Sequence, residues 1–570
     1  MPLSATLIMS RIAVVVLALL LSACSTRPET IVPPQHHDAA IASAHPLATE
    51  AGLRILQHGG NAFDAAVAVT AALAVVEPYS SGLGGGGFWL LHNARDDTQV
   101  MIDGRETAPL AAHRDMYLDA DGEVLPRASI DGPLAAGIPG VPAALEHLAK
   151  RYGRLPLRDS LQPAITLARE GFVVDEHYRR MAQFRLAALQ DNAAADIFLL
   201  DGEVPPAGHR ITQPDLARTL ERIAAQGAAG FYHGELAQRM VDAVRANGGI
   251  WSLQDLAQYR VIERLPLQFS YGGMRVTSVV PPSSGGVALA QMFNMLALGG
   301  FAQGDAVQQK HLLIEAMRRA YRDRAEFLGD SDFVEVPVIE LVSAAHAREL
   351  LTNLDRWRAT ASASLPTVAV DKYGGADTTH FSIVDHEGNR VAATLSINYP
   401  FGSGFVAGDS GVLLNDEMDD FSSKPGTPNV YGLVGAEANA IAPGKRMLSS
   451  MSPTFAEYGD RIAVLGTPGG SRIITMVLLG LLEFYRGTDA QGIVNAPRFH
   501  HQYLPDKVFY EPGALPADLL DALQAMGHDL QRLDSDYGNM QVVILDRRGG
   551  RAQAASDRRG VGAARVLRQP

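Results

Sequence analysis

Cysteine is almost missing from this chain, because its 570 residues contain only one, Cys24. A single thiol excludes an internal disulfide framework and any zinc site built on paired cysteines. No H-E-x-x-H helix and no EF-hand loop occurs either, so the sequence predicts no metal site. An excess of positive charge is also missing, since 62 acidic residues outnumber 49 basic ones. The net charge of −13 argues against the basic face of a nucleic-acid-binding protein.

The apolar run near the N-terminus lacks the length that a membrane-spanning helix needs. It covers residues 12–21 and directly follows Arg11. Its length and its positive flank are typical of an export signal. Met9 is an alternative start of translation, because Met9-Ser10-Arg11 is a more usual positively charged opening for an export signal. We therefore expect an exported protein that works in the periplasm.

The end of this run indicates how the exported chain is anchored. Leu21-Ser22-Ala23-Cys24 resembles a bacterial lipobox, in which the cysteine is lipidated and becomes the mature N-terminus. Residues 1–24 are thus interpreted as a lipoprotein-type signal peptide, and 25–38 as a tether. Ser25, in place of an aspartate, favours the outer membrane. An ordinary cleaved signal with an incidental cysteine is the alternative.

Helical and strand patterns fall into separate blocks along the rest of the chain. Apolar residues at helical spacing predict helices at 45–60, at 61–78 with Asn61 as N-cap, through most of 140–365, and at 471–487 and 516–528. Strand patterns predict a hairpin at 88–93 and 98–106, a short hairpin within 264–279, a hairpin at 381–385 and 390–398, and further strands at 461–466 and 541–546. Segregated blocks favour layered α+β architecture over a doubly wound sheet.

Residues 374–385, GGADTTHFSIVD, place two hydroxyls and an imidazole where a glycine-rich loop becomes a strand. A threonine hydroxyl is a weak nucleophile unless a base lies beside it. The α-amine of an N-terminal threonine, with an ordinary pKa of about 7.7–8.0, is such a base. An internal threonine gains that amine only when its hydroxyl attacks the preceding carbonyl and the peptide bond is cut. By itself, however, Thr-Thr-His is also typical of an ordinary strand edge.

Seven motifs in this order closely resemble the γ-glutamyltranspeptidase family of N-terminal-nucleophile hydrolases. They are QHGGNAFDAAVAV, GLGGGGF, DGRETAP, DTTHFSIVD, LLNDEMDDFSSKPGTPNVYGLV, KRMLSSMSPT and GTPGGSRI. The resemblance implies a four-layer α-β-β-α sandwich shared by two subunits cut from one precursor. The cut falls between Asp377 and Thr378, so residues 39–377 form the large subunit and 378–570 the small subunit of a heterodimer.

The resemblance also implies the catalytic residues. Thr378 is the nucleophile, and its α-amine is the base. Ser396 and Asn398, two residues apart on what we expect to be one face of a strand, hydrogen-bond the nucleophile. The backbone N–H groups of Gly469 and Gly470 form the oxyanion hole.

The substrate's γ-glutamyl group carries an α-carboxylate and an α-ammonium. By resemblance, Arg105 binds the carboxylate with its planar fork, helped by the hydroxyls of Ser449 and Ser450. The same resemblance assigns the ammonium to Glu417 and Asp420, together with the amide of Asn398.

A loop at 425–439 resembles the lid of the family, with Tyr431 as the aromatic that shields the glutamyl pocket. Cephalosporin (glutaryl) acylases among the relatives commonly lack this loop. Two positions depart from the family pattern: Ser396 stands where threonine is usual, and Asp416 where asparagine is usual. Serine keeps the hydroxyl, and Asp416 adds a negative charge near the ammonium.

The expected function is that of an exported γ-glutamyltransferase and glutathione hydrolase. Such an enzyme acts on glutathione and other γ-glutamyl compounds and passes the γ-glutamyl group to water, an amino acid or a peptide, without metal or coenzyme. One alternative is a glutaryl or cephalosporin (β-lactam) acylase with the same nucleophile. An alternative from another class is an unprocessed surface binding protein.

Overall fold

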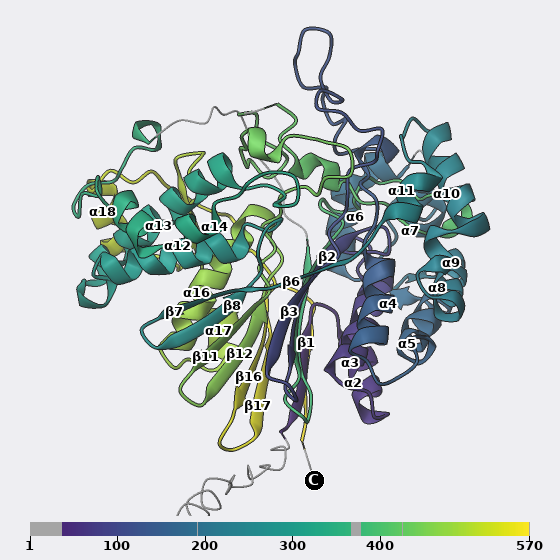
Figure 1. Ribbon diagram of the computed structural model, residues 1–570, viewed down its shortest axis with the longest axis horizontal. Coiled ribbons are helices and arrows are strands. Elements are labelled where there is room, and N and C mark those ends of the chain that lie inside the picture. Colours follow the sequence, from purple (N-terminus) through teal and green to yellow (C-terminus); the bar gives the residue numbers. More distant parts are fainter. Residues whose placement is uncertain (1–36, 191, 366–377, 425, 569–570) are drawn as a thin grey trace, which may run out of the picture. The chain divides into compact units, whose positions relative to one another are not determined.

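The computed structural model describes residues 37–568 except 191, 366–377 and 425. Its centre consists of two antiparallel sheets that pack face to face, and helices cover the outer face of each (Figure 1). This arrangement is the predicted four-layer α-β-β-α sandwich. Cys24, the signal and most of the tether lie outside the described residues, as does Asp377.

The first sheet has seven strands in the order β18-β1-β9-β10-β2-β3-β6. Their bounds are Ala563–Leu567, Ala39–Ser43, Thr379–Val384, Arg390–Ser396, Gly86–Asn93, Thr98–Asp103 and Ile262–Arg264. The strand after the expected cut, β9, lies between β1 and β10. A chain end at Thr378 therefore borders a central strand of this sheet, which pairs with β10 from Thr379 and with β1 from Phe381.

The second sheet has six strands in the order β17-β16-β12-β11-β8-β7. Their bounds are Arg551–Ser556, Gln541–Asp546, Arg461–Gly466, Thr454–Tyr458, Met274–Ser278 and Leu267–Tyr271. Short strands elsewhere are β4 Phe172–Val173, β5 Arg210–Ile211, β13 Phe499–His500, β14 Val508–Tyr510 and β15 Leu530–Arg532. Both sheets mix strands from before and after the expected cut, so the two subunits share each layer.

Two sets of helices form the outer layers. Beside the first sheet lie helices of the set α2 Pro46–Gln57, α3 Ala62–Val76, α4 Val141–Arg151, α5 Leu157–Glu170, α6 Glu176–Leu189, α7 Ala194–Phe198, α8 Pro214–Gln226, α9 Ala229–Tyr232, α10 Gly234–Ala246 and α11 Leu253–Gln258. Beside the second lie α12 Gly285–Leu298, α13 Ala306–Phe327, α14 Val338–Leu341, α15 Ala344–Leu350, α16 Ile473–Tyr485, α17 Ala490–Asn495 and α18 Ala517–Ala525. Each set closes its own hydrophobic core.

Helix α3 confirms the clearest local prediction. Asn61 is its N-cap and forms a capping box with Asp64, which satisfies backbone N–H groups at the helix start. Every residue of the helix is buried, as its all-round apolar surface requires. The predicted hairpins β2–β3, β7–β8 and β9–β10 are also present.

Strands β1 and β18 were not expected. β1 consists mostly of small residues, AAIAS, and directly follows the segment interpreted as a tether. It nevertheless lies between β9 and β18 with all five residues buried. Only the packed sheet assigns this segment to a strand, because its sequence has little periodicity.

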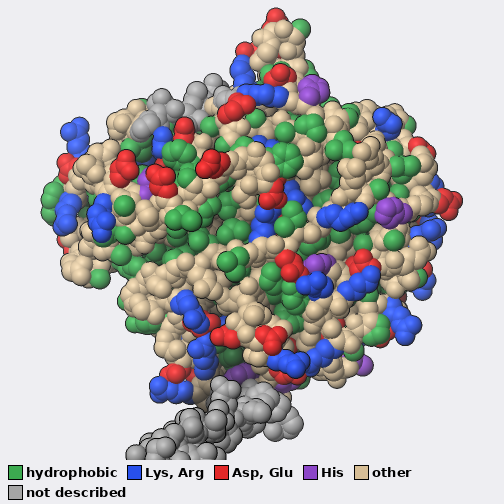
Figure 2. All heavy atoms as spheres, viewed as in Figure 1, with side chains coloured by type: hydrophobic (Ala, Val, Ile, Leu, Met, Phe, Trp, Pro, Cys, Tyr) green, Lys and Arg blue, Asp and Glu red, His purple; other side chains and the backbone are tan. Residues whose placement is uncertain are grey.

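The described helices include none with the length and apolar character to span a membrane. On the face shown in Figure 2, basic and acidic side chains are interspersed and do not gather into one basic patch.

Candidate active site

The candidate nucleophile lies at the entrance of β9. Thr378 directly precedes the strand and is buried. The register of β9 against β10 pairs Thr379 with Leu395, so one step further along, Ser396 faces Thr378. The structure thus brings the predicted hydroxyl partner opposite the predicted nucleophile.

Asn398 reaches the site differently from the prediction. Strand β10 ends at Ser396, and Asn398 adopts a left-handed backbone with φ of 74°. The expectation that both residues share a strand face was wrong, because the chain turns out of the sheet after Ser396. The turn is closed by the backbone N–H of Asn398, which donates to Oγ of Ser396 at 2.7 Å.

Asp416 fixes the orientation of the Asn398 amide. Nδ2 of Asn398 donates to the backbone oxygen of Asp416 at 3.0 Å and lies 3.3 Å from its Oδ2. The amide oxygen of Asn398 consequently points away as an acceptor, which suits an ammonium. Oδ1 of Asp416 accepts the backbone N–H of Tyr399 at 2.9 Å. Burial raises the pKa of Asp416 well above its ordinary value.

The predicted oxyanion loop links β12 to α16. Gly469 and Gly470 have φ of 139° and 54°, a region that favours glycine. A Cβ on Gly470 would lie 2.6 Å from the ring of Tyr431. The two glycines therefore allow both the turn and the close approach of the lid.

Tyr431, the aromatic of the predicted lid, lines the same cavity as Arg105 and Gly470. Its hydroxyl donates to the backbone oxygen of Asn398 at 2.5 Å. Two carboxylates hold the residues just before it: Asp419 accepts the N–H of Val430 at 2.8 Å, and Asp420 accepts from the amide of Asn429 at 3.0 Å. The lid is thus fastened to the acidic turn that contributes to the site.

Arg105 joins two acidic residues in one buried cluster. Its two terminal nitrogens donate to Glu417 and to Asp420, each at 2.5 Å. The side chain of Arg105 is only 1% exposed. The sequence analysis assigned Arg105 to the substrate's carboxylate, and Glu417 and Asp420 to its ammonium. The structure places Arg105 next to both acids. Such a cluster complements a zwitterion, whose two charges are equally close together.

Burial also changes the titration of this cluster. It raises the pKa of Glu417 to about 7, although the charge of Arg105 opposes the shift. Glu106, which we did not predict, is buried beside Arg105, and neither of its carboxylate oxygens has a hydrogen-bond partner in the described part of the chain. Burial and the charge of Glu417 raise the pKa of Glu106 well above its ordinary value. Its position within the DGRETAP motif was the only signal for it.

Ser449 and Ser450 are buried beside Arg105. The backbone N–H of Met451 donates to Oγ of Ser449 at 3.1 Å. A guanidinium N–H of Arg324 donates to Oγ of Ser450 at 3.2 Å. Both serine oxygens thus act as acceptors toward the protein, so their own hydrogens are available to a ligand.

These residues line one small cavity of about 20 Å³. The predicted residues among its lining are Arg105, Ser396, Glu417, Asp420, Tyr431, Ser449, Ser450 and Gly470. Three further predicted residues adjoin this set. Thr378 lies opposite Ser396 across the strands, Asn398 donates to Ser396, and Gly469 directly precedes Gly470. Eight predicted side chains or glycines from distant parts of the sequence therefore meet in one place.

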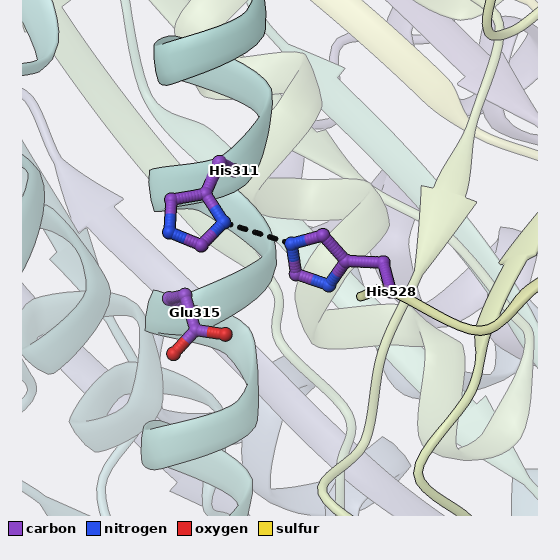
Figure 3. A group of neighbouring side chains, drawn as sticks. All are labelled: His311, Glu315 and His528. Atoms are coloured by element: carbon purple, nitrogen blue, oxygen red, sulfur yellow. Dashed lines mark hydrogen bonds between the residues drawn. The ribbon is translucent and has the colours of Figure 1, made fainter. Parts of the chain in front are cut away.

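Among the described residues, one group of side chains elsewhere has donor atoms spaced closely enough for a metal ion. His311, Glu315 and His528 have ligand atoms within 4.8 Å of one another (Figure 3). Nδ1 of His311 lies 2.8 Å from Nε2 of His528. The carboxylate of Glu315, however, already accepts hydrogen bonds from the guanidinium groups of Arg318 and Arg319. We interpret the group as part of an ion-pair network, because the two guanidinium groups bound to Glu315 would repel a metal ion at the same carboxylate.

The chain matches known proteins over nearly its whole length. A γ-glutamyltranspeptidase family model matches residues 48–567. The glutathione hydrolase proenzyme of Escherichia coli (strain K12) is 43% identical over 531 residues, which cover 91% of this chain and 90% of that protein.

Solved structures agree with this match. The cephalosporin acylase from Bacillus halodurans has a TM-score of 0.81 at 28% identity, covering 93% of this chain and 96% of that one. The γ-glutamyltranspeptidase of Helicobacter pylori has a TM-score of 0.55 at 39% identity, covering 57% and 94%. The sandwich, the order of the motifs and the match over residues 48–567 lead to one conclusion: the chain belongs to the γ-glutamyltranspeptidase family.

Proposed function

We propose that this protein is an exported γ-glutamyltransferase and glutathione hydrolase that activates itself by cutting the Asp377–Thr378 bond. The observation that carries the proposal is the buried cluster of Arg105, Glu417 and Asp420 beside the entrance of β9. A γ-glutamyl group presents an α-carboxylate and an α-ammonium on one carbon, and this cluster offers both complementary charges at that spacing.

Self-cleavage comes first. Oγ of Thr378 attacks the carbonyl carbon of Asp377, the C–N bond breaks, and the acyl group moves to oxygen as an ester. Water then hydrolyses the ester, which leaves a carboxylate on Asp377 and both a hydroxyl and an α-amine on Thr378. The burial of Thr378 at a central strand supports this step, because the new terminus stays in place after the cut.

Turnover uses the same hydroxyl. The α-amine takes the proton of Oγ as the hydroxyl attacks the γ-carbonyl, and the N–H groups of Gly469 and Gly470 stabilise the oxyanion. When the intermediate collapses, the amine of the substrate leaves and receives the proton from the α-amine of Thr378. A γ-glutamyl ester remains on Thr378. Water or the amino group of an acceptor then attacks the ester and releases the enzyme. Preorganised donors of this kind typically contribute about 10²–10³ in rate.

Two measurements test this function. On a denaturing gel, the purified protein should give two subunits, and the N-terminal sequence of the smaller should begin Thr-Thr-His-Phe. The processed protein should release cysteinylglycine from glutathione. A single uncut band with no release would refute the proposal and would favour an unprocessed binding protein.

The second candidate is a glutaryl or cephalosporin acylase. The likeness to the Bacillus halodurans acylase favours it at the level of fold. A glutaryl group lacks the ammonium, so the acidic cluster would have no partner in its substrate. The Tyr431 lid, fastened to the same acidic turn, supports the γ-glutamyl enzyme. A higher kcat/KM for a glutaryl than for a γ-glutamyl anilide would reverse this choice.

The location is also a proposal. We infer a periplasmic lipoprotein attached through Cys24, with the outer membrane favoured by Ser25. The lipobox supports this inference. Cys24→Ser should move the protein from the membrane fraction to the soluble periplasm and abolish labelling by a radioactive fatty acid. Unchanged fractionation would count against the anchor.

A further inference from the structure

Arg324 is a buried cation beside the candidate active site. It belongs to α13, and its side chain bonds two serine hydroxyls: Nε lies 3.0 Å from Oγ of Ser284, and a terminal nitrogen lies 3.2 Å from Oγ of Ser450. Among the residues described, no carboxylate forms an ion pair with Arg324 within 4.0 Å. Arg318 and Arg319 on the same helix are equally buried, and both pair with Glu315.

A buried guanidinium without a counter-ion is costly, because its charge loses hydration that two neutral hydroxyls do not replace. Arginine nevertheless keeps its charge in proteins. Burial lowers the pKa of Arg324, and the charges of Asp420 and Arg105 act on it in opposite directions. Arg324 therefore lies within the electrostatic field of the proposed substrate cluster, where an anion would compensate its charge.

The hydrogen bonds show how this charge reaches the cavity. Ser284 accepts from Arg324 and donates to the backbone oxygen of Ser449 at 2.7 Å, so its hydrogen is used. Ser450 also accepts from Arg324, and Ser450 is one of the residues that line the cavity. Because Arg324 donates to that oxygen, the hydroxyl hydrogen of Ser450 has to point toward a different acceptor. A carboxylate in the cavity is such an acceptor.

We infer that Arg324 is a second cation for the α-carboxylate of the γ-glutamyl group, acting through the hydroxyl of Ser450. The inference rests on the proposed function. Arg105 already faces three carboxylates, whereas Arg324 pairs with none among the described residues. The substrate's carboxylate completes the pairing of Arg324. Arg324 is a positioning residue, since it orients and polarises Ser450 and does not touch the reacting atoms.

Three anilides separate the substrate's charges. γ-Glutamyl anilide carries both charges, glutaryl anilide lacks the ammonium, and 4-aminobutyryl anilide lacks the carboxylate. Arg324→Met should lower kcat/KM about 10- to 100-fold for the two substrates with a carboxylate, the range for losing a charge-assisted hydrogen bond. It should lower kcat/KM for 4-aminobutyryl anilide less than about threefold, since that substrate offers nothing for Ser450 to bind.

Two further variants keep the test decisive. Arg324→Lys retains the charge, and it should recover part of the loss if Arg324→Met folds poorly. Ser450→Ala should show the same substrate pattern, and combining it with Arg324→Lys should add little. An equal loss on all three anilides, or additive effects in the double variant, would overturn the inference alone. Wild-type protein that does not cleave γ-glutamyl anilide would overturn the proposed function as well.

Discussion

Oγ1 of Thr379 donates a 2.6 Å hydrogen bond to Oε2 of Glu77, a buried carboxyl at the C-terminal end of α3. Thr379 immediately follows the proposed nucleophile. On its β10 side it is paired with Leu395, whereas the pairing of β9 with β1 begins only at Phe381. The bond from Glu77 thus supplies the second attachment at this end of the strand, and it comes from the other subunit.

This attachment predicts a role for Glu77 in holding the new terminus. Thr379→Val removes the hydroxyl at similar volume, so kcat should fall about 5- to 10-fold, the effect of one lost hydrogen bond with an ionisable group. KM for γ-glutamyl anilide should stay nearly constant, since the binding cluster is untouched. Thr379→Ser, which restores the hydroxyl, is the matched control. A rise in KM with unchanged kcat would contradict this role.

Glu77 should also make stability depend on pH. Burial raises its pKa from 4.5 to about 7. The folded state therefore holds the proton more tightly than the unfolded chain, so stability from this group is complete below pH 4.5 and is lost as the pH rises toward 7. Glu77→Gln should raise Tm at pH 8 relative to the wild type, with a smaller difference at pH 5. Calorimetry at the two pH values measures this. A difference that grows toward acid would show the opposite sign and exclude the explanation.

Thr378→Ala should yield an uncut and inactive precursor, because alanine offers no oxygen for either reaction. A denaturing gel and a γ-glutamyl anilide assay read the two effects separately. Thr378→Ser keeps an oxygen, and it should still be processed. A normal small subunit in the alanine variant would refute the assignment of the nucleophile.

Arg105→Lys should weaken substrate binding strongly. The guanidinium of Arg105 donates at once to Glu417 and Asp420, and in the proposed function it also binds the substrate's α-carboxylate. The single ammonium of lysine cannot make all of these contacts. We expect KM for γ-glutamyl anilide to rise about 10- to 100-fold, from the loss of charge-assisted hydrogen bonds. Steady-state kinetics on the processed variant check this, and an unchanged KM would count against the role of Arg105.

Tyr431→Phe should loosen the lid without removing its ring. The variant loses only the hydrogen bond to the backbone oxygen of Asn398. A lost neutral hydrogen bond corresponds to about a 2- to 10-fold effect, which we expect mainly in KM. The ring still packs on Gly470, so Tyr431→Ala should have the larger effect. Equal kinetics for wild type, Phe and Ala variants would show that the lid does not contribute to binding.

Local patterns in the sequence are sufficient to predict the elements that depend on neighbouring residues. Asn61 and Asp64 lie three residues apart, so the capping box that starts α3 could be predicted from neighbouring residues. The motif around Thr378 likewise specifies its own chemistry, because the hydroxyl, the future amine and the bond to be cut belong to adjacent residues. The family's motifs predicted the members of the site for the same reason, since each motif is local.

How the residues of the site face one another depends on the packing of the layers and could not be predicted from local patterns. Arg105 and Glu417 are 312 positions apart, and Glu77 and Thr379 are 302 apart. Such contacts depend on how the layers pack, and no local periodicity encodes them. The turn at Asn398, and the finding that Arg324 has no counter-ion among the residues the structure describes, became visible for the same reason. A buried charge is recognisable as functional only after every neighbouring side chain has been placed around it.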